Sequence, residues 1–110
     1  MEPDGLLSRL STSRDLAPFR EVVEPLVRYD RERGSDLVRT LRVYFACGGN
    51  ASEAADKLFL HRNSMLYRLA RIEKLTGADL KNPRVGLILQ LGLLAVEGEG
   101  RRKPDAVEHP

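Results

Sequence analysis

The sequence has few aromatic residues, a single cysteine and no long hydrophobic run. It contains three Phe, three Tyr and no Trp among 110 residues, so Leu, Val, Ile and Ala must form the core. Strands favour aromatic and β-branched side chains, and this leucine-rich composition with 31% charged residues therefore favours helices. No apolar run approaches the roughly 20 residues of a membrane-spanning helix, so we expect no membrane partner.

The lone Cys47 excludes an internal disulfide and a multi-cysteine metal site. We interpret it as a small buried apolar residue, which suits a reducing cytoplasm. The N-terminal sequence MEPDGLL is acidic where a signal peptide would be positively charged, and no apolar core follows it. We therefore expect a soluble cytoplasmic protein.

The net charge says little about the partner, but its distribution along the chain is informative. The formal charge is +2 and the pI is about 8.9, as in many ordinary domains. Residues 1–36 carry eight acidic and six basic residues, whereas residues 50–74 carry three acidic and five basic residues. A local excess of this kind produces a positive face, suited to a nucleic acid, on a nearly neutral protein.

Hydrophobic periodicity predicts five helices and no strand. The first spans about residues 15–33, where Pro25 predicts either a kink or two shorter helices. Ser35 or Asp36 caps the second, which ends at the glycine pair 48–49. The other three span about residues 50–58, 62–75 and 83–96.

The last of these helices has more apolar residues than one core-facing stripe needs. Leu89 and Leu93 form an apolar excess that suits either a dimer surface or packing against the N-terminal segment. The predicted core-facing stripe consists of Leu87, Ile88, Leu91, Leu94 and Ala95.

The two ends of the chain have little to pack. We expect residues 1–14 to be a loose segment, the stub of a larger protein, and residues 98–110 to be a disordered tail. Residues 15–97 then form a single domain. The expected fold is a compact all-α bundle of about five helices.

The third and fourth predicted helices are separated only by residues 59–61. Asn50 caps the third helix, and Glu53 follows three residues later as in a capping box. Two helices joined so closely cross at a steep angle, the geometry of a DNA-binding helix-turn-helix. Ala54 and Ala55 supply the small side chains that such a close approach needs.

The fourth helix has an apolar edge and a polar edge. Met65, Leu69 and Ile72 form the apolar edge, which holds the helix to the core. Residues early in such a helix reach base edges, where Arg pairs with guanine and Asn with adenine, and later residues reach phosphates. A serine at the front of the preceding helix can also hold a phosphate. The candidate DNA contacts are Ser52, His61, Arg62, Asn63, Ser64, Tyr67, Arg68 and Arg71.

Several candidates also have a structural alternative. His61, Asn63 and Ser64 suit helix capping, the ring of Tyr67 can pack on the preceding helix, and Arg71 can pair with a nearby acid. A metal site is disfavoured, because the only histidine besides His61 is close to the C-terminus.

A set of residues in this region resembles a known family. The set is Gly48-Gly49-Asn50, Ala54-Ala55, Leu58, His61-Arg62-Asn63-Ser64, Tyr67-Arg68-Leu69 and Ile72-Glu73. It resembles the C-terminal helix-turn-helix of PucR/CdaR-type transcription regulators and, more distantly, is similar to the Fis-type helix-turn-helix. The resemblance extends upstream to Tyr29-Asp30 and downstream to Leu91, about two-thirds of the chain.

The resemblance implies a bacterial transcription regulator that binds double-stranded DNA, with this module at the end of a longer chain that carries sensor domains. A homodimer is the expected assembly, and RNA polymerase is a further expected partner. Three positions depart from the family pattern. Ser64 replaces the usual Thr, Leu66 stands where the family often has a polar residue, and Phe59 stands where many helix-turn-helix proteins have Gly.

Other classes of function are weighed against DNA binding. The main alternative is a helical dimerisation or protein-interaction module that uses its leucine-rich last helix. RNA binding is disfavoured because no aromatic platform for stacked bases is present. No nucleophile-base-acid arrangement and no glycine-rich phosphate loop is present, so we expect neither an enzyme nor a cofactor.

Overall fold

A computed structural model of the chain describes residues 3–107, with the side chains of residues 3–100. Every regular element in this part is helical, so the predicted all-α class is confirmed. The elements are α1 (Pro3–Leu10), the 3-10 helix η1 (Arg14–Leu16), α2 (Ala17–Arg33), α3 (Leu37–Ala46), α4 (Ala51–Lys57), α5 (Arg62–Thr76) and α6 (Pro83–Val107). None of the described helices has the length and apolar character needed to cross a membrane.

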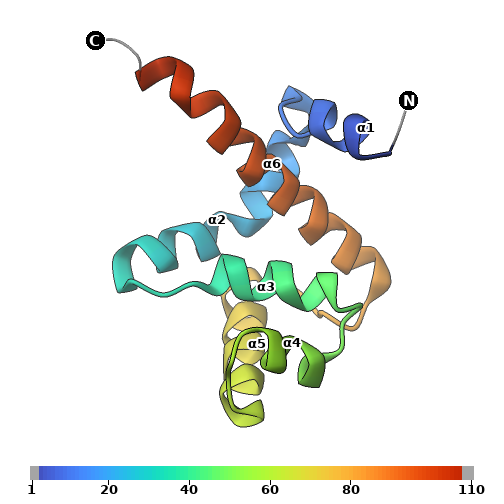
Figure 1. Ribbon diagram of the computed structural model, residues 1–110, viewed down its shortest axis with the longest axis vertical. Helices are drawn as coiled ribbons and strands as arrows, with labels where there is room; N and C mark the ends of the chain where they lie inside the picture. The colour runs from blue at the N-terminus through green and yellow to red at the C-terminus, as the bar shows by residue number, and fades with distance from the viewer. Residues whose placement is uncertain (1–2, 108–110) are drawn as a thin grey trace.

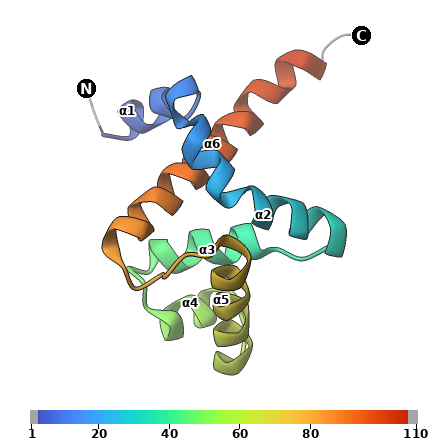
Figure 2. The ribbon, with the colours of Figure 1, turned by 180° about the vertical axis from the view of Figure 1, so that it is seen from behind.

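The helix pair α4 and α5 lies at one end of the molecule. Figures 1 and 2 show α1 and the C-terminal part of α6 at the opposite end, with α2 and α3 between the two groups. The N-terminal end of α5 therefore forms a tip that no other described helix covers.

One hydrophobic core holds α2, α3, α5 and α6 together. Met65 and Ile72 are fully buried and Leu69 is half-buried, which confirms the predicted apolar edge of α5. Burying one such side chain stabilises the fold by about 1.5–3 kcal/mol. The largest fully buried side chains are Val23, Leu26, Thr40, Leu41, Met65, Ile72 and Leu89.

The helix α2 is continuous across Pro25, so the predicted alternative of two shorter helices is wrong. The helix ends at Gly34, which has a φ of 65°. A left-handed residue closes a helix, and glycine adopts this conformation without a steric penalty. This end of α2 and the start of α3 form a corner beside α5 (Figure 1).

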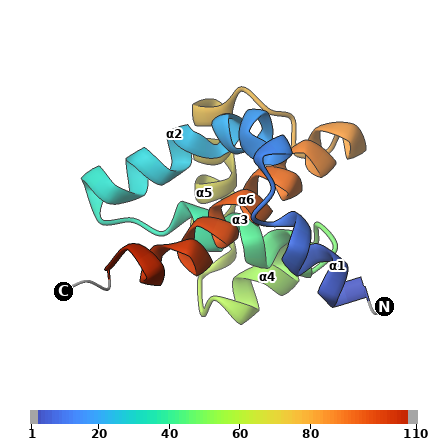
Figure 3. The same ribbon diagram turned by 90° about the horizontal axis from the view of Figure 1, so that it is seen from above.

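The core-facing side of α6 differs from the predicted one. Leu89 and Leu93 are buried, whereas Leu87 and Ile88 are exposed. The reason is Gly92, where an added Cβ would lie 2.5 Å from a backbone oxygen of α2. Glycine lets the two helices cross closely (Figure 3). The pattern of apolar side chains does not reveal that the face of α6 with Gly92 is the one that meets α2. The other predicted core residues, Leu91, Leu94 and Ala95, are half-buried or buried.

The two ends are more regular than predicted. Residues 3–10 form α1, and α6 continues to Val107 instead of ending near residue 96. The extension has partners, because Arg20 of α2 donates hydrogen bonds of 2.5 and 3.1 Å to the two carboxylate oxygens of Glu99. The rest of the two predicted loose ends, residues 1–2 and 108–110, lies outside the described residues. The domain boundaries remain a prediction.

Candidate nucleic-acid interface

A tight turn joins α4 to α5, as predicted. The N–H of Leu60 donates to the carbonyl of Ala55 at 2.8 Å, and that of Phe59 donates to the carbonyl of Asp56 at 3.2 Å. With Phe59 in the left-handed conformation, at a φ of 57°, these bonds form a Schellman motif. Ala54 and Ala55 are buried where the helices approach. Because Phe59 is 94% exposed, its side chain has no packing that offsets the strained backbone.

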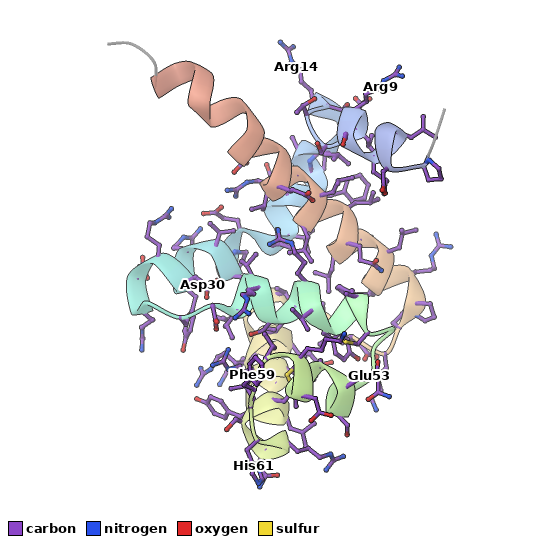
Figure 4. All side chains as sticks on the ribbon, in the orientation of Figure 1. Arg9, Arg14, Asp30, Glu53, Phe59 and His61 are labelled. Carbon is purple, nitrogen blue, oxygen red and sulfur yellow. The ribbon has the colours of Figure 1, made fainter. Side chains whose placement is uncertain are left out.

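Each helix of this pair begins at a side-chain cap. Asn50 Oδ1 accepts a hydrogen bond from the N–H of Glu53 at 2.9 Å, as predicted. His61 Nδ1 accepts one from the N–H of Asn63 at 3.1 Å, so His61 adopts the capping alternative. A neutral imidazole that accepts at Nδ1 carries its proton on Nε2. His61 therefore presents an N–H donor near the tip of the molecule (Figure 4).

Five of the eight predicted contact residues line a groove, and the other three lie outside it. A groove of about 690 Å³ separates α5 from the corner between α2 and α3, and we call it the α5 groove. Its corner wall includes Tyr29 and residues 34–37. Of the predicted residues, Asn63, Ser64, Tyr67, Arg68 and Arg71 line this groove. The remaining three, Ser52, His61 and Arg62, are exposed outside it.

Arg68 has partners inside the fold that the sequence did not predict. Its Nη1 atom donates to Asp36 Oδ1 at 2.5 Å and to Thr40 Oγ1 at 3.0 Å. Thr40 is fully buried, and the side chain of Arg68 is only 29% exposed. These bonds link α5 to α3, so the geometry gives Arg68 a role in positioning α5.

Asp30, near the end of α2, fixes the corner wall of the groove (Figure 4). Its carboxylate accepts hydrogen bonds from the N–H groups of Leu37 at 2.7 Å and Val38 at 2.9 Å, and from the Ser35 hydroxyl at 2.6 Å. The side chain of Asp36 makes no cap bond, although this residue occupies the N-cap position. The predicted cap by the side chain of Ser35 or Asp36 is therefore wrong, because Asp30 satisfies the free N–H groups instead.

Two tyrosines and two arginines lie close together between α2 and α5. The guanidinium carbon of Arg33 lies 5.4 Å from the ring centre of Tyr29, and that of Arg71 lies 5.9 Å from the same ring and 5.5 Å from that of Tyr67. These are cation–π distances. We call these four residues the tyrosine–arginine ladder.

A hydrogen bond completes the ladder on α5. Arg71 Nη2 donates to the Tyr67 hydroxyl at 2.7 Å. This bond lowers the pKa of the Tyr67 hydroxyl below its ordinary value and raises the pKa of Arg71. The acidic partner considered for Arg71 is not found among the described side chains, and the two aromatic rings hold the guanidinium instead.

Three residues of this surface were missed by sequence reasoning. Lys74 is exposed and lines a small hollow with Tyr67 and Arg71. It follows Arg71 by three residues, so helical spacing along α5 would have identified it. Tyr29 and Arg33 lie four residues apart at the end of α2, and no local signal in the sequence brings them to α5.

Comparison with known proteins assigns this helix pair to a family. Residues 37–95, from α3 into α6 and more than half of the chain, match the PucR C-terminal helix-turn-helix domain. The chain is also similar to the purine catabolism regulatory protein of Bacillus subtilis, with 34% identity over 87 residues, or 79% of this chain and 16% of that protein. No solved structure matches the chain.

Two further relatives come from the same bacterium. The proline-responsive transcriptional activator PutR is 32% identical over 68 residues, or 62% of this chain and 16% of that protein. The DNA-binding transcriptional activator AdeR is 39% identical over 57 residues, or 52% of this chain and 14% of that protein. The chain thus spans about a sixth of the length of these relatives. It belongs to the family of PucR C-terminal helix-turn-helix domains.

Proposed function

We propose that this DNA-binding transcription regulator of the helix-turn-helix class places α5 in the major groove of double-stranded DNA. The observation that carries the proposal is the two-sided character of α5. Met65 and Ile72 are fully buried on one side, and the other side is mainly polar, with Leu66 and Ala70 exposed among the polar side chains. The major groove is about 12 Å wide and admits one α-helix. The tip position of α5 lets it enter that groove without obstruction by α1 or α6 (Figures 1 and 2).

The residues divide by their place along α5. Arg62 and Asn63, in the first turn, have the donors and acceptors for base edges. The groups suited to phosphates are the exposed Nε2–H of His61, the hydroxyls of Ser52, Ser64 and Tyr67, and the guanidinium of Arg71. We assign Arg68 to positioning, because its guanidinium pairs with the Asp36 carboxylate and its side chain is only 29% exposed.

We further propose that the regulator acts as a homodimer in the bacterial cytoplasm. Two-fold pairing would place two copies of α5 about 34 Å apart and require a palindromic site. Leu89 and Leu93 are buried, so a contact through α6 would use the exposed Leu87 and Ile88. The same exposed pair is our candidate contact for RNA polymerase. The proposal assigns no catalytic step to the chain.

The test is fluorescence anisotropy of the chain with a mixed pool of labelled duplexes at several salt concentrations. If the chain contacts DNA phosphates, the logarithm of the affinity should fall linearly with the logarithm of the salt concentration. The slope of this line gives the number of phosphate contacts. With the preferred duplex, Arg62→Ala should lose about 1–3 kcal/mol of specific binding, whereas Arg71→Ala should weaken all sequences alike. Arg14→Ala is the control, because it removes the same charge at the opposite end of the molecule (Figure 4).

The alternative function makes a different prediction. A helical dimerisation or protein-interaction module would form a tight dimer by light scattering and show no salt-dependent affinity for DNA. That result, from a protein shown by circular dichroism to be folded, would contradict DNA binding. Unchanged affinity of both the Arg62 and the Arg71 variants would contradict only the contact assignment.

A further inference from the structure

The tyrosine–arginine ladder brings a part of α2 to the DNA-facing surface, although α2 lies outside the helix-turn-helix. We propose that Arg33 is a phosphate contact that acts together with Arg71 on one DNA strand, and that Tyr29 positions both guanidinium groups. This inference rests on the proposed function, since it concerns the same DNA with α5 in the major groove.

Arg33 and Arg71 both keep hydrogen-bond donors that a phosphate can use. A carboxylate that pairs with a guanidinium occupies its N–H groups, whereas an aromatic ring stacks on its face and leaves the N–H groups at its edge available. Arg33 forms no ion pair among the described side chains, and Arg71 uses Nη2 for the Tyr67 hydroxyl. Each arginine has five N–H donors, so both retain donors for a phosphate. Among the described side chains, carboxylates pair with Arg20, Arg28, Arg39 and Arg68, in contrast to Arg33 and Arg71.

The two acidic residues beside the α5 groove, Asp30 and Asp36, have partners within the fold. Asp30 accepts three hydrogen bonds from the start of α3 and the Ser35 hydroxyl. Asp36 pairs with Arg68 at 2.5 Å and lies 3.6 Å from a guanidinium nitrogen of Arg39. Both carboxylates therefore have cationic or N–H partners within the fold, which weakens their repulsion of a DNA phosphate.

The shape of this surface suits one strand of the DNA backbone. An α-helix with its side chains is about 10–12 Å across and so fills the width of the major groove. An element that stands beside such a helix must meet the sugar-phosphate backbone that borders the groove. The corner between α2 and α3 stands beside α5 across the α5 groove, which Tyr29 lines from one wall and Tyr67 and Arg71 line from the other. We therefore assign this groove to the backbone of one strand.

Arg33→Ala tests the contact directly, with Arg31→Ala as the matched control. Arg31 is an exposed arginine two residues earlier on α2, about 200° around the helix from Arg33. Loss of one phosphate contact should reduce the slope of log affinity against log salt by about 0.9, which is roughly an eightfold loss at 0.1 M salt. Arg33→Ala should show this loss on every duplex sequence, and Arg31→Ala should leave the slope unchanged.

The positioning role of Tyr29 has its own pair of variants. Tyr29→Phe keeps the ring under both guanidinium groups and should retain the wild-type slope. Tyr29→Leu removes the ring and should reduce the slope at least as much as Arg33→Ala. Thermal melts of both variants identify any loss of folding, because Tyr29 also packs against the core.

The outcomes separate this inference from the proposed function. Wild-type binding to DNA with equal slopes for the Arg33 and Arg31 variants would overturn the inference and leave the function intact. Absence of salt-dependent binding by the wild-type chain would overturn both. An equal loss for Tyr29→Phe and Tyr29→Leu would overturn the role of the ring.

Discussion

Asp36 and Arg68 are 32 residues apart in the sequence, yet Asp36 Oδ1 accepts a hydrogen bond of 2.5 Å from Arg68 Nη1. The bond joins the start of α3 to the middle of α5. A second bond, from the same nitrogen to the buried hydroxyl of Thr40, holds the guanidinium against α3. The orientation of α5 on the core therefore depends on a polar contact as well as on the packing of Met65 and Ile72.

A double-mutant cycle on Asp36→Ala and Arg68→Ala should reveal this contact as a coupling energy. Charged hydrogen bonds contribute about 1.5–3 kcal/mol, but the exposed fractions of 29% and 45% lower this value through solvent screening. We expect a coupling of about 1 kcal/mol from urea unfolding. The control cycle pairs Asp36 with Arg39, which is 62% exposed and 3.6 Å away, and should give a smaller coupling. Additive effects for Asp36 and Arg68 would contradict the positioning role.

Phe59→Gly should raise the free energy of unfolding by about 1 kcal/mol. A left-handed non-glycine residue costs about 1–2 kcal/mol, and the greater freedom of glycine in the unfolded chain offsets about 0.5–1 kcal/mol of the gain. Chemical denaturation measures the change. Phe59→Ala is the control, because it removes the exposed ring and keeps the strained φ of 57°. Equal stabilisation by both variants would show that the ring, rather than the backbone, is responsible.

Gly92→Ala should destabilise the fold, whereas Gly100→Ala should not. The new Cβ at residue 92 would lie 2.5 Å from the carbonyl oxygen of Phe19, while nothing lies within 4 Å at residue 100. Overpacking of this kind costs about 1–3 kcal/mol, partly offset by the gain of about 1 kcal/mol from alanine in a helix. Thermal melts of the two variants distinguish the overpacking, which affects only Gly92→Ala, from the helix propensity of alanine, which affects both. A Gly92→Ala protein as stable as the wild type would contradict the close crossing of α6 and α2.

Glu24 should make the fold more stable at neutral pH than in acid. The hydrogen bond from Arg20 lowers the pKa of Glu24 below its ordinary value of 4.5. The unfolded chain therefore binds the proton more readily, so the stabilising contribution is complete above about pH 4.5 and is lost as the pH falls through the lowered pKa. Urea midpoints measured from neutral pH into acid should fall less steeply for Glu24→Gln. Identical pH profiles would show that other carboxylates account for the acid sensitivity.

Sequence reasoning succeeded where the determinant of structure is local. Asn50 caps α4, as predicted, three residues from the backbone N–H group that it satisfies. The predicted break at residues 59–61 lies within the observed turn at residues 58–61, and its shortness was enough to predict a tight turn between the two helices. The division into helices was therefore largely predictable, as was the polar face of α5.

Sequence reasoning failed where the partner lies in another helix. Asp30 caps α3 from seven and eight residues away, in place of the nearer Ser35 and Asp36. The buried side of α6 depends on where Gly92 meets α2, a contact with no signal in the apolar pattern. Tyr29 is likewise brought to α5 only by the tertiary fold. The candidate interface therefore includes a part of α2 in addition to the predicted helices α4 and α5.

The stacking in the tyrosine–arginine ladder also bears on the entropy of association. A free arginine samples many rotamers, and immobilising such a side chain at an interface costs about 0.5–1.5 kcal/mol. The rings of Tyr29 and Tyr67 already restrict Arg33 and Arg71 before any DNA arrives. In the proposed phosphate contacts these two cations would thus be preorganised, and more of their attraction to phosphate would be retained as binding free energy.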